Sequence, residues 1–231
     1  DLIYKQIIFD IDDTIIDFAN TEYVALNSLF KFHGWNITPE IRKNYHAYNQ
    51  GLWRLHEQGK LTYEELSEIC FRDFIKREYD IDVNGKQIMA EYRHYFGNTH
   101  KLIPGAKEAL QYFKNQGYYL AALSNGETFM QKKRLKLANV AQYFDLIITS
   151  QEAQASKPNS AIFDYFFSRS KVSVNQSLLF GDGLSSDILG ATNYGLDCVW
   201  FNHCHRKNLL RLTPLLEVDT YSDFIKYCKN H

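Results

Sequence analysis

The hydrophobic positions along the chain form five short runs of the length of a β-strand. These runs are continuous and do not alternate with polar residues, which is typical of strands in a sheet that is covered on both faces, as parallel sheets are. They span residues 5–11, 118–124, 145–150, 177–182 and 197–201.

Helical patterns follow the later strands. Residues 104–117 begin with Pro104, place apolar side chains at helical spacing on one face and end at Gly117, so this segment predicts a helix with both ends marked. Similar patterns cover residues 125–140, 159–170, 185–195 and 220–230. Strands that alternate with helices predict an α/β fold with a doubly wound, Rossmann-like parallel sheet.

The first strand is followed by about 80 residues without a convincing strand, far more than the dozen or so that a crossover needs besides its helix. This stretch carries four amphipathic helical patterns, at residues 19–34, 39–59, 62–79 and 84–97. We therefore expect an inserted α-helical domain over residues 17–98, with residues 1–16 and 99–231 forming the α/β core.

Composition and charge limit the classes of binding partner that we expect for the protein. The 231 residues are 45% hydrophobic, and 26 Lys and Arg against 27 Asp and Glu give a net charge of -1, so neither a nucleic acid polymer nor a membrane surface is the expected partner. The four cysteines lack C-x-x-C spacing, and the first residues lack the features of a signal peptide, so we expect free thiols and a cytoplasmic location. The sequence carries no signal for an oligomeric state.

Polar residues collect where the predicted strands end, which is where open parallel sheets bind their ligands. They are Asp10, Asp12 and Asp13 after the first strand, Ser124 and Asn125 after the second, Lys157 after the third, and Asp182 and Asp187 after the fourth. Positions i and i+2 of a strand point to the same side, so Asp10 and Asp12 are expected to face one pocket. The carboxylates of Asp10, Asp12, Asp182 and Asp187 together carry four negative charges and require a compensating cation, for which Mg²⁺ and the Lys157 ammonium are suited. With both present one negative charge remains, so one carboxyl group is expected to keep a proton.

Four motifs in this set resemble those of the haloacid dehalogenase-like hydrolase superfamily, in the same order and each at the expected strand end. They read DIDDT (residues 10–14), LSN (123–125), SKP (156–158) and GDGLSSD (181–187). The resemblance spans the core, about two-thirds of the chain, and the helical insertion is similar to the small helical cap of that superfamily. One D-x-D motif is weak support, whereas four in order are strong.

The resemblance implies a role for each motif residue. Asp10 would be the nucleophile that forms an aspartyl-phosphate, and Asp12 the general acid that protonates the leaving oxygen and later activates water. The phosphate would be held by the Ser124 hydroxyl, the Asn125 backbone N–H and the Lys157 ammonium. Mg²⁺ would be bound by Asp10, the Asp12 backbone carbonyl and Asp182, with Asp187 behind them on a metal-bound water or on Lys157.

Details of the motifs narrow the expected reaction. Asp12 speaks against true dehalogenases, and Asp13, where phosphomutases of the superfamily usually carry Gly, favours a phosphatase. Residues 178–202 and 48–62 look most like the YjjG-type pyrimidine 5'-nucleotidases, which implies a nucleoside monophosphate as substrate. Flavin mononucleotide, phosphoglycolate or a sugar phosphate remain alternatives, as does a phosphomutase. A phospho-accepting signalling module is the rival of another class, although it needs neither the cap nor Asp12.

Two further groups of residues can be interpreted either as part of a functional site or as ordinary structural residues. Asn49, Trp53 and Arg54, with Tyr45 and Tyr48, would suit a base-binding face, or they pack within the helical domain. His203, Cys204 and His205 suggest a metal site, but no fourth ligand stands at a usual spacing, which favours an ordinary loop after the fifth strand.

Overall fold

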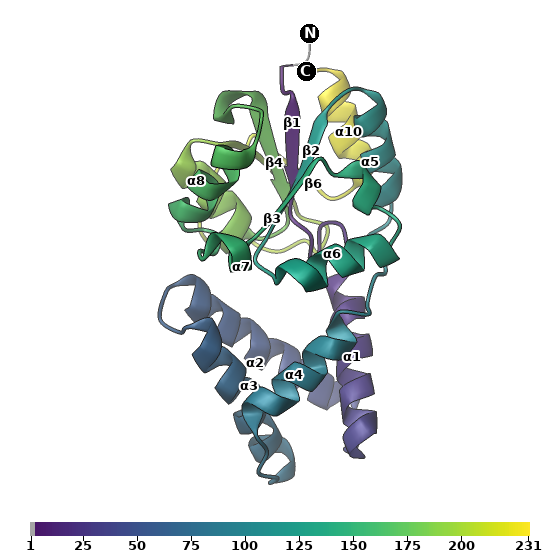
Figure 1. Cartoon of the computed structure of the whole chain (residues 1–231), viewed down its shortest axis with the longest axis vertical. Coiled ribbons are helices and arrows are strands. Elements are labelled where there is room, and N and C mark those ends of the chain that lie inside the picture. The colour runs from purple at the N-terminus through teal and green to yellow at the C-terminus, as the bar shows by residue number, and fades with distance from the viewer. Residues whose placement is uncertain (1–2) are drawn as a thin grey trace. The chain divides into compact units, whose positions relative to one another are not determined.

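The computed structural model describes residues 3–231, and within them it contains a six-stranded parallel sheet in the order β3-β2-β1-β4-β5-β6 (Figure 1). The strands are Gln6–Phe9 (β1), Tyr119–Ser124 (β2), Leu146–Thr149 (β3), Ser177–Gly181 (β4), Asp197–Phe201 (β5) and Leu216–Val218 (β6). The predicted α/β fold with a parallel sheet is confirmed. The sequence did not predict β6, because it has three residues and only Val218 among them is buried.

Along the central strands, the side chains that point to one face of the sheet and those that point to the other are both buried. This explains why apolar and polar residues do not alternate in the strand sequences. On β1, Ile7 and Phe9 belong to one hydrophobic cluster and Ile8 to another. The first cluster includes residues of α5 (Ala106–Asn115), α6 (Thr128–Leu137) and α10 (Tyr221–Lys229). The second includes residues of α8 (Ser160–Arg169) and α9 (Leu189–Tyr194), so helices cover both faces of the sheet (Figure 1).

The strand order reverses at β1, which lies between β2 and β4. Phe9, the last residue of β1, pairs with Ala122 on one side and with Phe180 on the other. The loops that leave β1, β2 and β4 therefore start at one edge of the sheet, at the kind of switch point where open α/β sheets place their ligand sites. Residues that are more than 100 positions apart in the sequence meet at this edge.

The chain divides into two compact units. One comprises the segment up to Phe18 together with His100–His231, and the other is Ala19–Thr99. The second unit is helical and contains most of α1 (Phe18–His33) with α2 (Pro39–Glu57), α3 (Tyr63–Tyr79) and α4 (Gly85–Phe96). Its core is rich in aromatic rings, for example Tyr45, which stacks on Phe71 with 5.3 Å between ring centroids.

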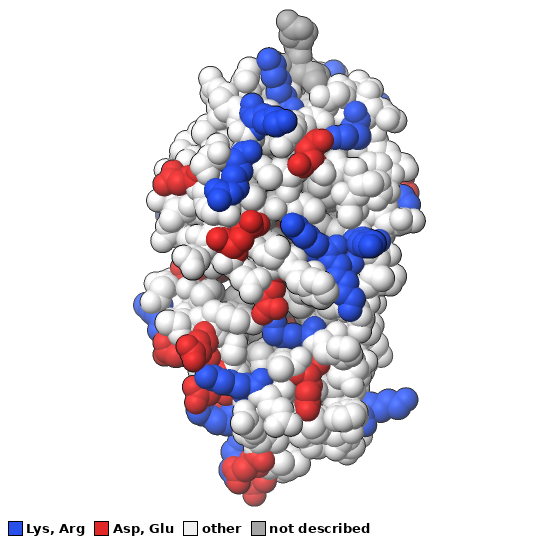
Figure 2. Space-filling view, in the orientation of Figure 1, with Lys and Arg blue, Asp and Glu red and all other residues white. Residues whose placement is uncertain are grey.

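The surface gives no sign of a single dominant charge on the face shown in Figure 2, where Lys and Arg are interspersed with Asp and Glu. Among the described residues, none of the helices combines the length and apolar character that crossing a membrane requires. Four short elements complete the core unit among the described residues: two 3₁₀ turns, over Ala141–Tyr143 and Val174–Gln176, the helical turn α7 (Ser150–Ala153) and a π-helical turn over Leu184–Ile188.

The contact between α3 and α4 depends on a missing side chain at Gly85, the first residue of α4. A Cβ atom there would lie 1.8 Å from the backbone carbonyl oxygen of Glu68. Gly85→Ala should therefore force the two helices apart and lower the free energy of unfolding by about 1–3 kcal/mol. The matched control is Gly51→Ala within α2, where a Cβ meets no atom within 4 Å. It should leave stability unchanged or raise it by up to about 1 kcal/mol. Denaturant unfolding of both variants checks this, and equal stabilities would contradict the packing described.

Candidate functional site

A buried lysine ties together the loops at the carboxyl edge of the sheet. Lys157 is 1% exposed. Its Nζ donates hydrogen bonds to Asp10 Oδ1 at 3.1 Å, to Asp187 Oδ1 at 2.6 Å and to the Leu123 carbonyl oxygen at 2.6 Å. All three Nζ protons therefore have an acceptor, and two of these acceptors are carboxylates. The ammonium is fixed beside the Asp10 carboxylate that follows β1.

Asp187 is the counter-ion that holds this lysine in place. Its side chain is fully buried, and its second oxygen, Oδ2, accepts a hydrogen bond from the backbone N–H of Gly183 at 3.0 Å. The carboxylate lies directly under the end of β4, where a Cβ atom on Gly181 would come within 2.4 Å of Oδ2. Glycine at position 181 is thus required by the close approach of Asp187 to the strand.

Asn125 secures the backbone of the lysine loop. Its Oδ1 accepts from the Lys157 N–H at 2.7 Å, and its Nδ2 donates to the Lys157 carbonyl oxygen at 3.0 Å. The neighbouring Ser124 hydroxyl accepts from the Gly126 N–H at 3.1 Å and from Gln131 Nε2 at 2.8 Å. The structure therefore brings Ser124 and Lys157 to one edge of the sheet. The Asn125 side chain holds the backbone at Lys157 in place, a role that the sequence did not indicate.

The electrostatics of this edge favour a bound proton or a bound cation. Burial, the charge of Asp187 and a hydrogen bond with Asp182 raise the pKa of Asp10 well above its usual range, and the nearby Lys157 offsets only part of this. Burial and the charges of Asp187 and Asp13 likewise raise the pKa of Asp182 to about 7. For Lys157, burial lowers the pKa, but the Asp10 and Asp187 carboxylates outweigh burial and raise it.

The donor set fits a small hard cation. Asp10, Asp182 and Asp187 each offer a carboxylate oxygen, and these three oxygens all lie within 4.8 Å of one another. Carboxylate oxygens are the ligands that Mg²⁺ prefers, and a cation among them would relieve the repulsion that raises the two pKa values. Thr14 Oγ1 orients Asp182 by donating to its Oδ1 at 3.0 Å and by accepting from its N–H at 3.2 Å.

Two residues of α6 that the sequence motifs did not indicate hold Asp12. Arg134 Nη1 donates to Asp12 Oδ1 at 2.7 Å, and Gln131 Nε2 donates to Oδ2 at 2.9 Å. Arg134 also donates to Gln131 Oε1 at 2.8 Å, and both side chains are fully buried. Asp12 is therefore fixed separately from Asp10, which pairs with Lys157. The available signal was a polar pair three residues apart on one face of a predicted helix.

The residues expected to recognise a base all lie on α2. Asn49 is 6% exposed, Trp53 is half-buried with its ring 5.5 Å from that of His56, and the Arg54 side chain is exposed. Tyr45 is fully buried in the helical core, and Tyr48 stacks on Phe74. For Tyr45 the packing interpretation accounts for the aromatic side chain.

Comparison with known proteins agrees with this geometry. The model of the haloacid dehalogenase-like hydrolase family matches residues 7–201. YfnB of Bacillus subtilis is 33% identical over 93% of this chain and 91% of its own. A crystal structure of YfnB bound to magnesium superposes with a TM-score of 0.93 and 31% identity, covering 97% of this chain and 98% of that one.

Two further relatives carry names that state an activity. The pyrimidine 5'-nucleotidase PynA of Streptococcus pneumoniae is 29% identical over 97% of this chain and 94% of its own. The pyrimidine 5'-nucleotidase YjjG of Escherichia coli is 27% identical over 99% of both chains. With four motifs at one sheet edge and a family match over most of its length, the chain belongs to the haloacid dehalogenase-like hydrolases.

Proposed function

We propose that this protein is a Mg²⁺-dependent phosphomonoesterase that hydrolyses nucleoside 5'-monophosphates through an aspartyl-phosphate. The observation that carries the proposal is the cluster around Lys157, where the buried ammonium and the carboxylates of Asp182 and Asp187 surround the Asp10 side chain. Such a site suits a phosphate dianion together with a divalent cation. Relatives named as nucleotidases support the choice of substrate class.

In the proposed reaction, a carboxylate oxygen of Asp10 attacks phosphorus while the bond from phosphorus to the ester oxygen breaks. Asp12 gives its proton to that leaving oxygen, and the nucleoside departs as an alcohol. Asp12 then takes a proton from a water molecule, which attacks the phosphorus and releases inorganic phosphate from Asp10. Lys157 and the Ser124 hydroxyl would bind the phosphate oxygens and hold them during both steps.

Mg²⁺, held by Asp10, Asp182 and the backbone carbonyl of Asp12, would neutralise charge on the phosphate and on the carboxylates. Asp187 would act from behind, since its oxygens are taken by Lys157 and by the Gly183 N–H. Arg134 and Gln131 would be positioning residues for Asp12, because they bond both of its oxygens.

Substrate choice would lie with the helical unit. Asn49, Trp53 and Arg54 on α2 are the residues we assign to the nucleoside, with the exposed Arg54 guanidinium suited to the polar edge of a base. The names of the two nucleotidase relatives favour a pyrimidine base over other groups.

A panel of phosphate monoesters tests the proposed activity. Pyrimidine and purine 5'-monophosphates, flavin mononucleotide, phosphoglycolate and a hexose phosphate would each be incubated with Mg²⁺ or with EDTA, and released phosphate measured. We expect turnover of nucleoside monophosphates that EDTA abolishes and that Asp10→Asn removes. The proposal would be overturned if no ester released phosphate in the presence of Mg²⁺, or if Asp10→Asn kept full turnover. Preference for a non-nucleotide ester would overturn only the substrate class.

The hydrogen bonds from α6 to Asp12 give a second prediction, which compares two esters whose leaving groups differ in their need for a proton. Arg134→Lys should leave Asp12 poorly oriented and lower kcat for a nucleoside 5'-monophosphate by roughly ten- to a hundredfold. The first-turnover burst of nitrophenolate from p-nitrophenyl phosphate should fall much less, because nitrophenolate departs without a proton and the burst precedes the attack of water. The control is Lys132→Ala, an exposed neighbour on the same helix. A nitrophenolate burst that slows as much as nucleotide turnover would indicate general damage to the site and contradict a positioning role.

The raised pKa of Asp182 predicts how stability depends on pH when divalent cations are removed. Its pKa is about 7 in the folded protein against an ordinary value of 3.8, so the folded state binds this proton more tightly than the unfolded chain. The resulting stabilisation is complete below about pH 4 and is lost as pH rises to about 7. In EDTA, the free energy of unfolding should therefore fall over this interval more than it does in Asp182→Asn.

Excess Mg²⁺ should reverse the loss, since it binds the ionised carboxylates of the folded state. Asp219→Asn, at a half-exposed position of the same unit, serves as the control and should keep the pH dependence. An unchanged profile in Asp182→Asn would contradict the electrostatic description. Denaturant titrations across pH at constant ionic strength provide the measurement.

A further inference from the structure

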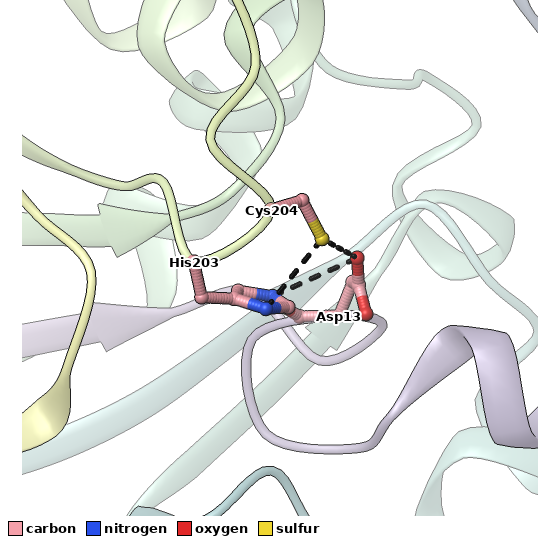
Figure 3. A group of neighbouring side chains, drawn as sticks. All are labelled: Asp13, His203 and Cys204. Carbon is pink, nitrogen blue, oxygen red and sulfur yellow. Dashed lines mark hydrogen bonds and ion pairs between the residues drawn. The ribbon is translucent and has the colours of Figure 1, made fainter.

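A second group of metal-ligating side chains lies beside the carboxylate cluster. Asp13 follows the motif aspartates after β1, and His203 and Cys204 follow β5 (Figure 3). One ligand atom from each residue lies within 4.8 Å of the others. Cys204 Sγ is 3.6 Å from His203 Nδ1 and 3.7 Å from Asp13 Oδ2. The sequence alone did not indicate Asp13 as a further ligand beside His203 and Cys204, because Asp13 precedes His203 by 190 residues.

The hydrogen bonds of His203 define which ring nitrogen can bind a metal. Nε2 lies 2.7 Å from the Asp13 carbonyl oxygen, which can only accept, so Nε2 carries a proton. In the neutral ring the lone pair is then on Nδ1, the atom that faces the Cys204 sulfur. Metal-binding histidines commonly donate their other ring N–H to a carbonyl or carboxylate in this way, which fixes the orientation of the ring.

The two separations from the Cys204 sulfur to its neighbouring ligand atoms match those of a tetrahedral zinc site. With Zn–S near 2.3 Å and Zn–N or Zn–O near 2.0–2.2 Å, tetrahedral geometry places neighbouring ligand atoms about 3.5 Å apart. The two distances from Cys204 Sγ, 3.6 and 3.7 Å, are close to that value. One sulfur, one nitrogen and one oxygen form a set that zinc accepts and that Mg²⁺, which prefers oxygen, does not.

We propose that Asp13, His203 and Cys204 form a binding site for a borderline-soft divalent cation, with Zn²⁺ as its representative, separate from the carboxylate cluster that suits Mg²⁺. Three protein ligands leave one position for water. The two sites adjoin, because Asp13 shares the loop of Asp10, and Asp182 lines the same small hollow as His203 and Cys204.

Cys204 lies at an exposed position, and its thiol donates a hydrogen bond to Asp13 Oδ2. Partial burial and the Asp13 carboxylate raise the pKa of this thiol, which disfavours the thiolate until a cation is bound. Zinc binding would release that proton to solvent and form the thiolate as a ligand. Asp13 is already oriented, since its Oδ1 accepts from the Phe18 N–H at 3.2 Å, which leaves Oδ2 facing the sulfur.

Arg206 sets the strength of the site. Its Nη2 lies 3.9 Å from Asp13 Oδ2, and its side chain is 47% exposed, so the guanidinium competes with a cation yet can turn toward solvent. Removing it with Arg206→Ala should tighten zinc binding by about two- to fivefold, the usual effect of an exposed ion pair.

The test measures zinc binding to the full chain in saturating Mg²⁺, by competition with a chromogenic chelator. We expect one site that is lost in Cys204→Ala and weakened at least tenfold in His203→Ala. The matched controls are His205→Ala and Cys228→Ala, which lie in the same unit and should bind zinc as the unchanged protein does.

Two further readouts keep the test independent of any activity. Co²⁺ at the site should give a thiolate-to-metal charge-transfer absorption that Cys204→Ala removes, and zinc binding should release a thiol proton. Zinc affinity that is unchanged in Cys204→Ala, or that falls in proportion as Mg²⁺ is raised, would place the ion at the carboxylate cluster and overturn the proposal. Failure of the phosphatase assay leaves these measurements unaffected.

Discussion

The ion pairs of Lys157 are the constraint on which the rest of the site depends. Burying an ammonium without a partner is costly, and here Asp187 and Asp10 provide the compensating charge. With Asp182 nearby, the carboxylates outnumber the lysine three to one. Burial and the remaining negative charge raise the pKa values of Asp10 and Asp182, and they make this edge of the sheet a place where a proton or a divalent cation is stabilised.

The fold supplies the parts of this arrangement from distant segments. β1 and β4 lie side by side at the strand-order reversal, so Asp10 and Asp182 emerge together, and Lys157 arrives from the loop after α7. Asn125 fixes the backbone of that loop through two hydrogen bonds. α6 adds Arg134, which keeps Asp12 apart from Lys157. The two aspartates of the D-x-D motif thus have different partners, as two different chemical roles require.

Much of the fold could be predicted from the sequence because its signals are local. Continuous apolar runs indicated β1 to β5, amphipathic patterns indicated the helices of the inserted unit, and Pro104 and Gly117 marked both ends of the segment that contains α5. β6 was not predicted, because its three residues include only one buried side chain and so form no hydrophobic pattern. The Lys157 ammonium was anticipated as a compensating charge, and its contact with Asp187 as one of two alternatives that the resemblance implies. The anchors of Asp12 and the contact of Asp13 with Cys204 could not be predicted, since each joins segments more than 100 residues apart.

The central claim is that Asp10 becomes phosphorylated during turnover. Rapid mixing of the protein with a nucleoside 5'-monophosphate labelled in its phosphate, followed by acid quenching within the first turnover and peptide mapping, tests it directly. The account predicts a transient acid-stable acyl phosphate on the peptide that contains Asp10, absent in Asp10→Asn. Steady phosphate release with no label on the protein at any time, or label on another residue, would contradict it.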